Sequence, residues 1–365
     1  MSVLHVVSVS GGKDSAATLL LALERFGSSR VVPVFCDTGN EHERTYAYLD
    51  HLEQALGVRI MRLRASFEDE IAAKRMFIAR DTRHRREYQR VSKVDRAGRA
   101  VYRRHRDGSL VMVPVIDAKT GETVGQQPVQ ATGWNAGRKV RWTNKAKRRA
   151  LAVLHPTGNA FLDLCLWKGR FPSRKAQFCT EQLKRDPAVS FQLGLIEAGH
   201  TVVSWQGVRR DESPNRRAAT KFERLAPRLY AFRPLVDWSA AEVFAYCAGR
   251  SLQPNPLYLQ GMSRVGCMPC INVNKAELRE IAVRFPEHLQ RIAEWEFKVS
   301  AASKRGGSTF MTESHAARDR RKVFADLHIW SRVQWATTRR GGRQYDLLAS
   351  AEPSTACASA YGLCE

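Results

Sequence analysis

Residues 8–15 read SVSGGKDS, and they stand between a short apolar run and a longer Ala/Leu-rich segment. The run before them is rich in β-branched side chains, which predicts a buried parallel strand. The segment after them predicts a helix packed on that strand. Gly11 and Gly12 let backbone N–H groups turn toward a ligand, the helix start adds its positive dipole end, and Lys13 adds a full charge. The stretch therefore predicts a phosphate-binding turn between a strand and a helix.

The same alternation continues along the chain. VVPVFC (31–36) predicts a second strand, EHERTYAYLDHLEQALG (41–57) a helix, and VRIMRL (58–63) a third strand. Strands that alternate with helices indicate an α/β fold with a doubly wound parallel sheet. Its ligand should lie at the carboxyl ends of the strands, where both SGGKDS and CDTGN (36–40) fall.

A basic segment interrupts this pattern at about residues 81–150. It carries 18 Lys and Arg residues against 6 Asp and Glu residues, in a chain of formal net charge +23. Short strand-like runs flank the turn signals RDGS and AKTGE. A field of this sign favours a polyanionic partner such as nucleic acid, and a solvated basic surface is the alternative.

The end of this insertion interleaves aromatic and basic residues in the stretch GWNAGRKVRWTNKAKRR. Such a pattern suits base stacking and phosphate contact on an unpaired strand, and it also suits a small hairpin core with a basic face. The predicted nucleic-acid-binding residues are Trp134, Arg138, Lys139, Arg141, Trp142, Lys145, Lys147 and Arg148.

The α/β pattern resumes after the insertion. Strands are predicted at 201–207 and 229–235, and a helix in 237–250 with Ser239 as its N-cap. The segment that follows the last cysteine pair is helical in pattern and is interrupted near Pro286.

We predict two domains. Residues 1–235 form a nucleotide-binding domain that contains the basic insertion, and residues 236–365 form a helical C-terminal region with a CxxC pair and a cysteine-containing tail.

The N-terminus leads directly into the first strand, and no apolar run reaches the roughly 18 residues of a membrane span. We therefore expect a cytoplasmic protein that makes no membrane contact.

Several segments, taken in order, resemble a known family. SGGKDS resembles the SGGxDS pyrophosphate loop of the PP-loop ATP pyrophosphatase superfamily, and it is not a Walker A loop. The segments CDTGNEHERTYAYLDHL, FCTEQLKRDP, GVRRDES, PLVDWSAAEVFAYC, NPLYLQGMSRVGCMPC and RFPE resemble the phosphoadenosine phosphosulfate (PAPS) reductase family. Together they cover most of the chain outside the basic insertion.

The resemblance implies an enzyme of one of two chemistries. Sulfonucleotide reductases carry a cysteine near a C-terminal ECG[LI]H and generally lack the lysine of the loop, whereas ATP-using relatives, such as the DNA phosphorothioation sulfurtransferase, keep SGGKDS. This chain has Lys13, lacks ECG[LI]H and ends in GLCE. A lysine offsets the charge that develops on leaving pyrophosphate. We therefore expect an ATP-dependent sulfurtransferase acting on nucleic acid. The alternatives are a PAPS or APS reductase that releases sulfite and a non-catalytic subunit that binds nucleotide or nucleic acid.

The resemblance also implies roles for the nucleotide-binding residues. MgATP would place its phosphates over the loop, with Lys13 stabilising charge and Asp14 orienting the loop or approaching Mg²⁺. Asp37 would face the nucleotide or metal or cap its own turn, and Arg209 or Arg210 would clamp phosphate or pair with neighbouring acids. The full predicted set is Ser10, Gly11, Gly12, Lys13, Asp14, Ser15, Asp37, Lys184, Arg209 and Arg210.

The eight cysteines indicate metal binding or reactive thiols more than a disulfide scaffold. Cys267 and Cys270 form a CxxC pair, and the resemblance adds Cys179 as a ligand of a 4Fe–4S cluster. In one ligand set these three cysteines leave one iron open to carry sulfide, and in the other Cys364 or Cys357 is the fourth ligand. Cys364 is also predicted as a catalytic thiol that carries sulfur. Zinc or a reducible thiol pair are the alternatives to the cluster.

The other cysteines and the sulfur source complete these predictions. Cys165 and Cys247 lie in apolar runs and are predicted to be buried, and Cys36 at a strand end is predicted to be structural. A sulfur donor such as a cysteine desulfurase is the expected protein partner.

Overall fold

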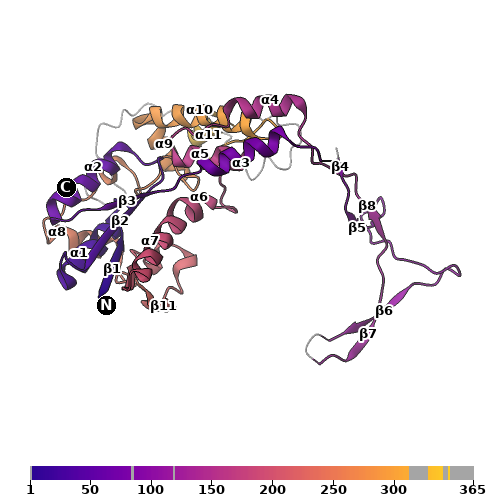
Figure 1. The fold of residues 1–365 in the computed structure, drawn as a ribbon, viewed down its shortest axis with the longest axis horizontal. Coiled ribbons are helices and arrows are strands. Elements are labelled where there is room, and N and C mark those ends of the chain that lie inside the picture. The colour runs from indigo at the N-terminus through magenta and orange to yellow at the C-terminus, as the bar shows by residue number, and fades with distance from the viewer. Residues whose placement is uncertain (1, 84–85, 118–119, 312–327, 340–343, 346–365) are drawn as a thin grey trace. The chain divides into compact units, whose positions relative to one another are not determined.

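The computed structural model describes residues 2–83, 86–117, 120–311, 328–339 and 344–345. The chain divides into two compact units, one made of Met1–Met76 with Lys145–Glu365 and the other of Phe77–Asn144 (Figure 1). Within the described residues, no helix has the length and apolar character to cross a membrane.

The larger unit is built on a six-stranded sheet with the strand order β11-β12-β10-β1-β2-β3. All neighbours run parallel except β11, which is antiparallel to β12. The strands are β1 (Val3–Ser8), β2 (Val31–Asp37), β3 (Met61–Arg64), β10 (Thr201–Trp205), β11 (Phe222–Ala226) and β12 (Leu229–Phe232). The predicted α/β class with a mostly parallel sheet is confirmed, and the antiparallel edge strand was not predicted.

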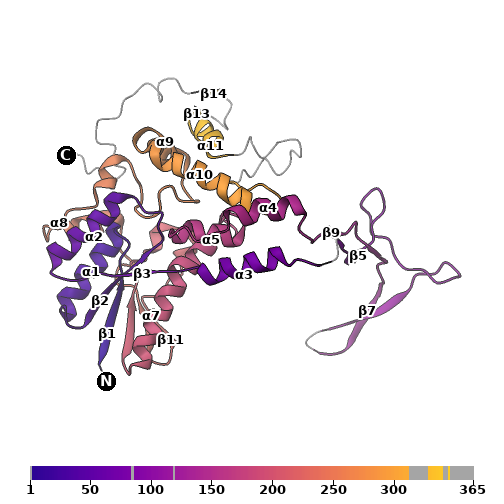
Figure 2. The same ribbon diagram turned by 45° about the horizontal axis from the view of Figure 1, so that its top comes forward.

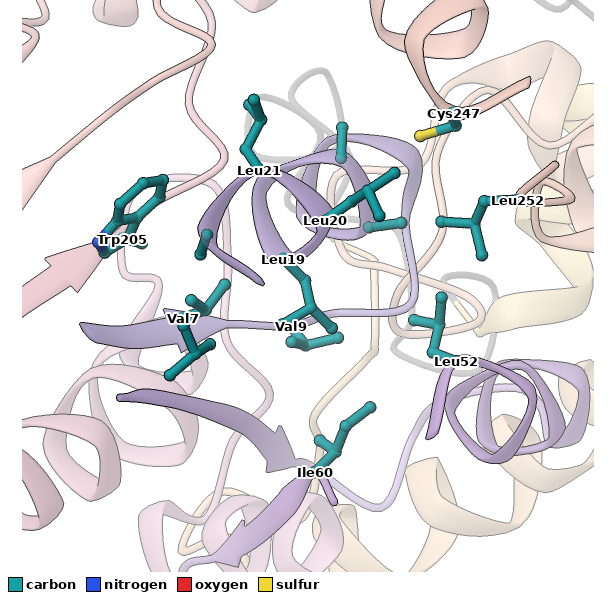
Figure 3. Close-up of a cluster of buried hydrophobic side chains, with 14 of the residues drawn as sticks. Val7, Val9, Leu19, Leu20, Leu21, Leu52, Ile60, Trp205, Cys247 and Leu252 are labelled. Carbon is teal, nitrogen blue, oxygen red and sulfur yellow. The ribbon is translucent and has the colours of Figure 1, made fainter. Parts of the chain in front are cut away.

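Alternate side chains of each strand pack on opposite faces of this sheet, as strand geometry requires. Val6 joins a buried cluster with Phe191 and Leu195 of helix α7 (Asp186–Glu197). Its neighbour Val7 joins the larger cluster formed with helices α1 (Lys13–Phe26), α2 (Glu43–Leu56) and α8 (Ala240–Ala248) (Figure 3). Helices therefore cover both faces, which is the doubly wound arrangement. Each fully buried aliphatic side chain in these clusters stabilises the fold by about 1.5–3 kcal/mol.

The three helices of the larger cluster are bounded by clear sequence signals. Helix α1 (Lys13–Phe26) begins inside the SGGKDS motif, with Gly12 as its N-cap. Helix α2 (Glu43–Leu56) is capped by His42, whose Nδ1 accepts the Arg44 N–H, and it ends at Gly57 in the left-handed conformation. Helix α8 (Ala240–Ala248) starts with a complete capping box, which confirms Ser239 as its N-cap.

The C-terminal part of this unit is helical, as predicted (Figure 2). Helix α9 (Lys275–Arg284) ends two residues before Pro286, which is the first residue of α10 (Pro286–Ala302). The remaining elements of the unit are α3 (Glu68–Ala79), α4 (Asn144–Val153), α5 (Ala160–Lys168), α6 (Phe178–Thr180), a π-helical turn (Glu181–Arg185), 3₁₀ turns at Arg210–Glu212, Pro214–Arg216 and Pro256–Gln260, α11 (Ile329–Ala336), β13 (Thr338–Arg339) and β14 (Gln344–Tyr345).

The smaller unit, Phe77–Asn144, is made of short antiparallel pairs. Strand β4 (Arg86–Glu87) pairs with β9 (Arg138–Lys139), β5 (Arg90–Ser92) with β8 (Thr132–Trp134), and β6 (Met112–Ile116) with β7 (Thr123–Pro128). A hydrogen bond joins the first and last parts of this unit, in which the Asp81 carboxylate accepts the Trp142 N–H at 2.8 Å.

Three turns in this unit are closed by aspartates. Asp95, Asp107 and Asp117 each accept a backbone N–H from their own turn, at 2.8, 2.9 and 3.1 Å. This is the way in which Asp stabilises turns. The turns predicted at RDGS and AKTGE are confirmed.

Candidate functional site: a phosphate loop beside a group of thiols

The SGGKDS loop is shaped by a glycine in the left-handed region. Gly11 has φ +74°, and a Cβ built on it would lie 2.8 Å from Thr45 Cγ2. Both the conformation and the close approach therefore require glycine. The chain also passes close to the loop at Gly207, where a Cβ would lie 3.0 Å from the Asp14 carbonyl group.

The two serines of the loop bind each other. Ser15 Oγ accepts the Ser10 N–H at 3.0 Å and donates to the Gly12 carbonyl at 2.8 Å. Ser10 Oγ also donates to Ser15 Oγ at 3.2 Å. Ser15 is thus buried and stabilises the loop internally, while Ser10 is exposed. Of the two predicted hydroxyls, Ser10 has the better access to a ligand.

Asp14 joins the loop to two cationic side chains. Its Oδ2 lies 3.2 Å from Lys13 Nζ, and its Oδ1 accepts from Arg209 Nε at 2.6 Å. Arg209 is 4% exposed and also binds Asp211 through NH1 at 2.5 Å. Burial acts to lower the pKa of Arg209, and the two carboxylates outweigh it and raise the pKa overall. Asp14 therefore orients the loop, and Arg209 lies beside it as a permanent positive charge.

A segment from the C-terminal region closes over the loop. Asn255 Nδ2 donates to the Gly11 carbonyl at 3.1 Å, and the hydroxyl of buried Tyr258 accepts the Lys13 N–H at 3.0 Å. Lys13 Nζ lies 5.5 Å from the centre of the Tyr258 ring and 5.9 Å from that of Phe244. Tyr258 therefore contacts the loop through its hydroxyl and the lysine through its ring.

The same segment continues into the CxxC pair, which lies against the DTGN turn. Cys267 Sγ lies 3.5 Å from Thr38 Oγ1 and 3.7 Å from Glu41 Oε1. Glu41 is 3% exposed and accepts from the Thr38 hydroxyl at 2.7 Å. Burial raises the pKa of the Cys267 thiol to about 12, against the opposing charge of Lys184. The thiol is thus held inside the protein beside a buried carboxylate.

Further sulfur and cationic groups surround this thiol. The charge of Cys267 raises the pKa of Lys184, and Glu41, Cys270 and Cys179 act in the same direction. Burial raises the pKa of Cys179, and Cys270 adds to this effect. Lys184 was predicted as a phosphate ligand, but the structure places it among the cysteines.

Two further polar groups lie near Cys270. Cys270 acts to raise the pKa of Arg264, and the Asn272 N–H points at Cys270 Sγ at 3.5 Å. Together with Lys184, this arginine offsets the negative charge that the thiolates of Cys179, Cys267 and Cys270 would bring. Three thiolates are the soft ligands that iron–sulfur and zinc centres use, but the sulfur atoms of these described cysteines do not all lie within 4.8 Å of one another. Cys357 and Cys364, the predicted sources of a fourth ligand, lie outside the described residues.

The remaining cysteines occupy structural positions. Cys165 is fully buried and Cys247 is 6% exposed, as their apolar surroundings predict. Cys36 donates its thiol hydrogen to the Lys184 carbonyl at 3.3 Å. This bond ties the end of β2 to the π-helical turn that carries Lys184.

Two predicted ligands bind other protein groups. Asp37 Oδ1 accepts the Gly39 N–H at 2.9 Å and the Tyr46 hydroxyl at 2.7 Å, which is the turn-capping alternative. Arg210 pairs with Asp237 and donates to the Ala219 carbonyl at 2.9 Å. Arg209 is therefore the arginine of this pair that contacts the loop.

A pair of stacked histidines lies on the other side of the DTGN turn. His42 and His288 have ring centres 4.7 Å apart, and with Glu287 they offer three potential metal ligands. However, His42 Nδ1 accepts a backbone N–H and His288 Nδ1 accepts from the Arg291 guanidinium at 2.9 Å. Each neutral ring therefore carries its proton on Nε2, and neither Nε2 has a lone pair for a metal. The arrangement fits two neutral histidines better than a metal site.

The predicted nucleic-acid-binding residues fall in both units. Trp134 is 66% exposed, with the Arg90 guanidinium 5.4 Å from its ring centre, whereas Trp142 is 7% exposed. The ring of Trp142 is therefore not accessible to a nucleobase. Trp142 lies at the end of the smaller unit, where Asp81 accepts its N–H. The side chains of Arg138 and Lys139 lie outside the described part of the structure. Arg141 in the smaller unit and Lys145 and Arg148 on α4 are exposed, and Lys147 is half-buried.

Sequence reasoning missed several residues that build the site, above all Glu41, Asn255, Tyr258 and Arg264. Each lies within a segment that the family resemblance had marked. The signal that could have found Asn255 and Tyr258 is a polar residue before Pro256 and an aromatic residue after it, in a stretch leading to the CxxC pair.

The structure is that of an α/β protein whose SGGKDS loop lies at the carboxyl end of β1, the edge of the sheet where such folds bind ligands. The chain belongs to the phosphoadenosine phosphosulfate reductase domain family, whose model matches residues 4–273. The members of this family are enzymes, including reductases.

Individual relatives are spread over a wide range of similarity. An uncharacterised protein of Escherichia phage 186 is 41% identical over all of this chain and 97% of its own length. An uncharacterised protein of Methanocaldococcus jannaschii is 23% identical over 80% of this chain, which spans 40% of that protein. The adenosine 5'-phosphosulfate reductase of Geobacillus kaustophilus is 34% identical over 27% of this chain and 44% of its own length.

The solved structures that match this chain do so at low similarity. The PAPS reductase of Candida auris in a phosphate complex aligns with a TM-score of 0.37 and 13% identity, over 74% of this chain and 83% of that one. The FMN adenylyltransferase of Candida glabrata, in complex with FAD and pyrophosphate, aligns with a TM-score of 0.33 and 11% identity, over 72% and 54%.

Proposed function

We propose that this protein is an ATP-dependent sulfurtransferase that adenylates an oxygen of a nucleic acid, releases pyrophosphate and replaces the activated oxygen with sulfur. The observation that carries the proposal is the continuity of the segment 255–270. It binds the phosphate loop through Asn255 and Tyr258 and then supplies Cys267 and Cys270. A nucleotide and a sulfur centre would thus share one site.

The phosphate side of the site supplies charge and backbone donors. MgATP would place its phosphates at the start of α1, where the helix dipole and the N–H groups of the loop favour anions. Lys13 and Arg209 bring positive charge to this point, and Asp14 holds both in position. They would stabilise the charge that builds up as pyrophosphate leaves.

The chemistry balances in two displacements. An acceptor oxygen attacks the α-phosphorus of ATP, the bond to the β-phosphate breaks, and pyrophosphate leaves with the electron pair. A sulfur nucleophile at the oxidation level of sulfide then attacks the activated atom, and AMP leaves with the oxygen. Where sulfur arrives as a persulfide, a second thiol must reduce the mixed disulfide, and a disulfide forms.

The thiol side of the site would hold the sulfur. An iron–sulfur centre bound by Cys179, Cys267 and Cys270 would supply a coordination position for sulfide, and a donor such as a cysteine desulfurase would deliver the sulfur. Lys184 and Arg264 would offset part of the negative charge that the cysteines acquire once a bound metal has displaced their thiol protons. Cys364, in the tail, would then be the thiol that carries sulfur, because a fourth cysteine ligand would fill the position that sulfide needs.

Nucleic acid is the proposed acceptor because of the smaller unit. This unit presents exposed aromatic side chains, Tyr88, Tyr102 and Trp134, among a large excess of basic residues. Exposed rings next to guanidinium groups are suited to stacking on unpaired bases.

The first test is anaerobic calorimetry of one preparation with MgATP and with PAPS. We expect tight MgATP binding that Lys13→Ala abolishes, weak PAPS binding, and pyrophosphate release that requires nucleic acid and a sulfide source. PAPS binding that is tighter by about tenfold or more (~1.4 kcal/mol) would contradict the proposal.

The second candidate function is sulfonucleotide reduction, and the identity to adenosine 5'-phosphosulfate reductases over about a quarter of this chain favours it. In that case a thiol donor would be oxidised while sulfite is released, and nucleic acid would have no effect. The two functions differ in a single assay, because sulfite forms in one and pyrophosphate in the other.

A further inference from the structure

We propose that Tyr258 is a positioning residue that transmits nucleotide occupancy of the phosphate loop to the CxxC segment. The inference rests on the proposed nucleotide site and adds to it a mechanical link to the thiols. It starts from one hydrogen bond, in which the Tyr258 hydroxyl accepts the Lys13 N–H at 3.0 Å.

That N–H is one of the donors a phosphate would use. Lys13 is the first residue of α1, so its N–H has no carbonyl partner within the helix, and the N-cap Gly12 has no side chain to accept it. A phosphate oxygen at the helix start would therefore take the place of the Tyr258 oxygen. The hydroxyl is close to the loop on its other side as well, 3.2 Å from where a Cβ of Gly12 would stand. Phosphate and hydroxyl thus compete for one donor.

Displacement of the hydroxyl would act on the cysteines because the intervening chain is tightly held. Tyr258 is 1% exposed and its ring packs edge-on against Phe244 at 5.4 Å. The Met262 N–H donates to the Leu257 carbonyl at 3.2 Å, and the Met268 N–H donates to the Asn40 carbonyl at 2.7 Å. Five residues separate the two bonded positions 262 and 268, so we infer that a movement at position 258 reaches Cys267.

The link is reciprocal by thermodynamic necessity. If a phosphate must displace the hydroxyl, then binding is weakened by the strength of that hydrogen bond, and the segment 255–270 loses one anchor when the nucleotide binds. Loss of the hydroxyl should therefore strengthen binding and remove the response of the segment. This would expose the thiols for sulfur transfer only after ATP has bound.

The experiment is hydrogen exchange of the full-length protein with and without saturating MgATP, and separately with inorganic pyrophosphate. In the wild type we expect protection of residues 10–20 and exchange that is at least about threefold faster in residues 261–273, where the Met262 and Met268 N–H groups report. In Tyr258→Phe we expect the same protection of residues 10–20, no nucleotide response in residues 261–273, and pyrophosphate binding that is about threefold to tenfold tighter. If Tyr258 only stabilised the fold, Tyr258→Phe would raise the exchange rate of residues 261–273, and this rate would still respond to nucleotide as it does in the wild type.

The matched control is Tyr246→Phe, which removes a tyrosine hydroxyl that donates to Glu24 at 2.6 Å, away from the loop. It should behave as the wild type in both readouts. Unchanged exchange in residues 261–273 with protected residues 10–20, or weaker pyrophosphate binding in Tyr258→Phe, would overturn the link alone. Absence of protection at residues 10–20 with either ligand would overturn the nucleotide site itself.

Discussion

At the scale of single residues, the site depends on positions where only one side chain is compatible with the local geometry. Gly11 is the clearest of these, because its positive φ and the Thr45 methyl group both exclude a Cβ. We expect Gly11→Ala to lower the free energy of unfolding by about 2–3 kcal/mol and to abolish MgATP binding.

Gly57→Ala is the control for this prediction. It has a similar φ of 61°, but a Cβ there would meet nothing within 4 Å. Gly57→Ala should lower the free energy of unfolding by about 1 kcal/mol, because it strains only the backbone conformation, and MgATP binding should be unchanged. Equal costs for the two variants in urea unfolding would show that the contact with Thr45 does not matter.

Asp14 carries a second prediction, because it is the carboxylate that holds buried Arg209. Asp14→Asn leaves that guanidinium with Asp211 as its charged partner and should lower the free energy of unfolding by about 2–4 kcal/mol. Asp237→Asn removes the partner of Arg210, which is exposed, and should cost no more than about 0.5 kcal/mol. Urea unfolding of both variants checks the difference, and a reversed order would contradict the structural role of Asp14.

At the scale of elements, α2 and α10 meet through the stacked pair of His42 and His288. Burial lowers the pKa of His42 to about 4 and also lowers the pKa of His288. The unfolded chain therefore binds more protons than the folded one between pH 6.5 and about 4, so stability should fall as the pH falls through this range. The contribution of His42 is up to about 3 kcal/mol.

His42→Asn tests this because asparagine can still cap α2 and does not titrate. Its free energy of unfolding should depend less on pH between 6.5 and 4.5 than that of the wild type, with a remaining slope from His288. His51→Asn, an exposed position on the same helix, serves as the control and should keep the wild-type slope. If His42→Asn keeps the full slope, then the proton uptake lies elsewhere.

The elements also show how far sequence alone leads. Every predicted strand and helix outside the insertion is present within a few residues, because β-branched runs, caps and Pro286 are local signals. The strand–turn–helix geometry of the SGGKDS loop was predicted correctly for the same reason, since Gly11, Gly12 and Lys13 are adjacent in the sequence. Tyr258 and Glu41 were missed because their roles arise from contacts between distant segments. The sequence also did not indicate that Lys184 faces the cysteines, because a lysine carries no signal of which anion it faces.

At the scale of the whole molecule, the smaller unit joins the larger one through two chain crossings, and the Asp81–Trp142 hydrogen bond brings the two ends of the insertion together. Replacing residues 84–139 with a short Gly-Ser linker should therefore leave the larger unit folded. We expect MgATP affinity to stay within about twofold, because the loop and its partners lie in the larger unit. Binding of single-stranded nucleic acid should weaken, and the slope of log affinity against log salt should become shallower by about 0.7 for each phosphate that the shortened protein no longer neutralises. Unchanged binding and salt dependence would exclude the smaller unit as the nucleic-acid surface.

The strand order has a consequence for how the chain is made. β1 lies between β2 and β10, and β2 leaves the ribosome soon after β1, whereas β10 begins at Thr201, after the whole insertion. At about 5–20 residues per second, roughly 10–40 s of synthesis separates the two pairings. During this time β1, with its apolar Val6 and Val7, presents an open edge to other nascent chains. We therefore expect that slower initiation or a chaperone holdase improves the yield of folded protein, and that shortening the insertion does so as well.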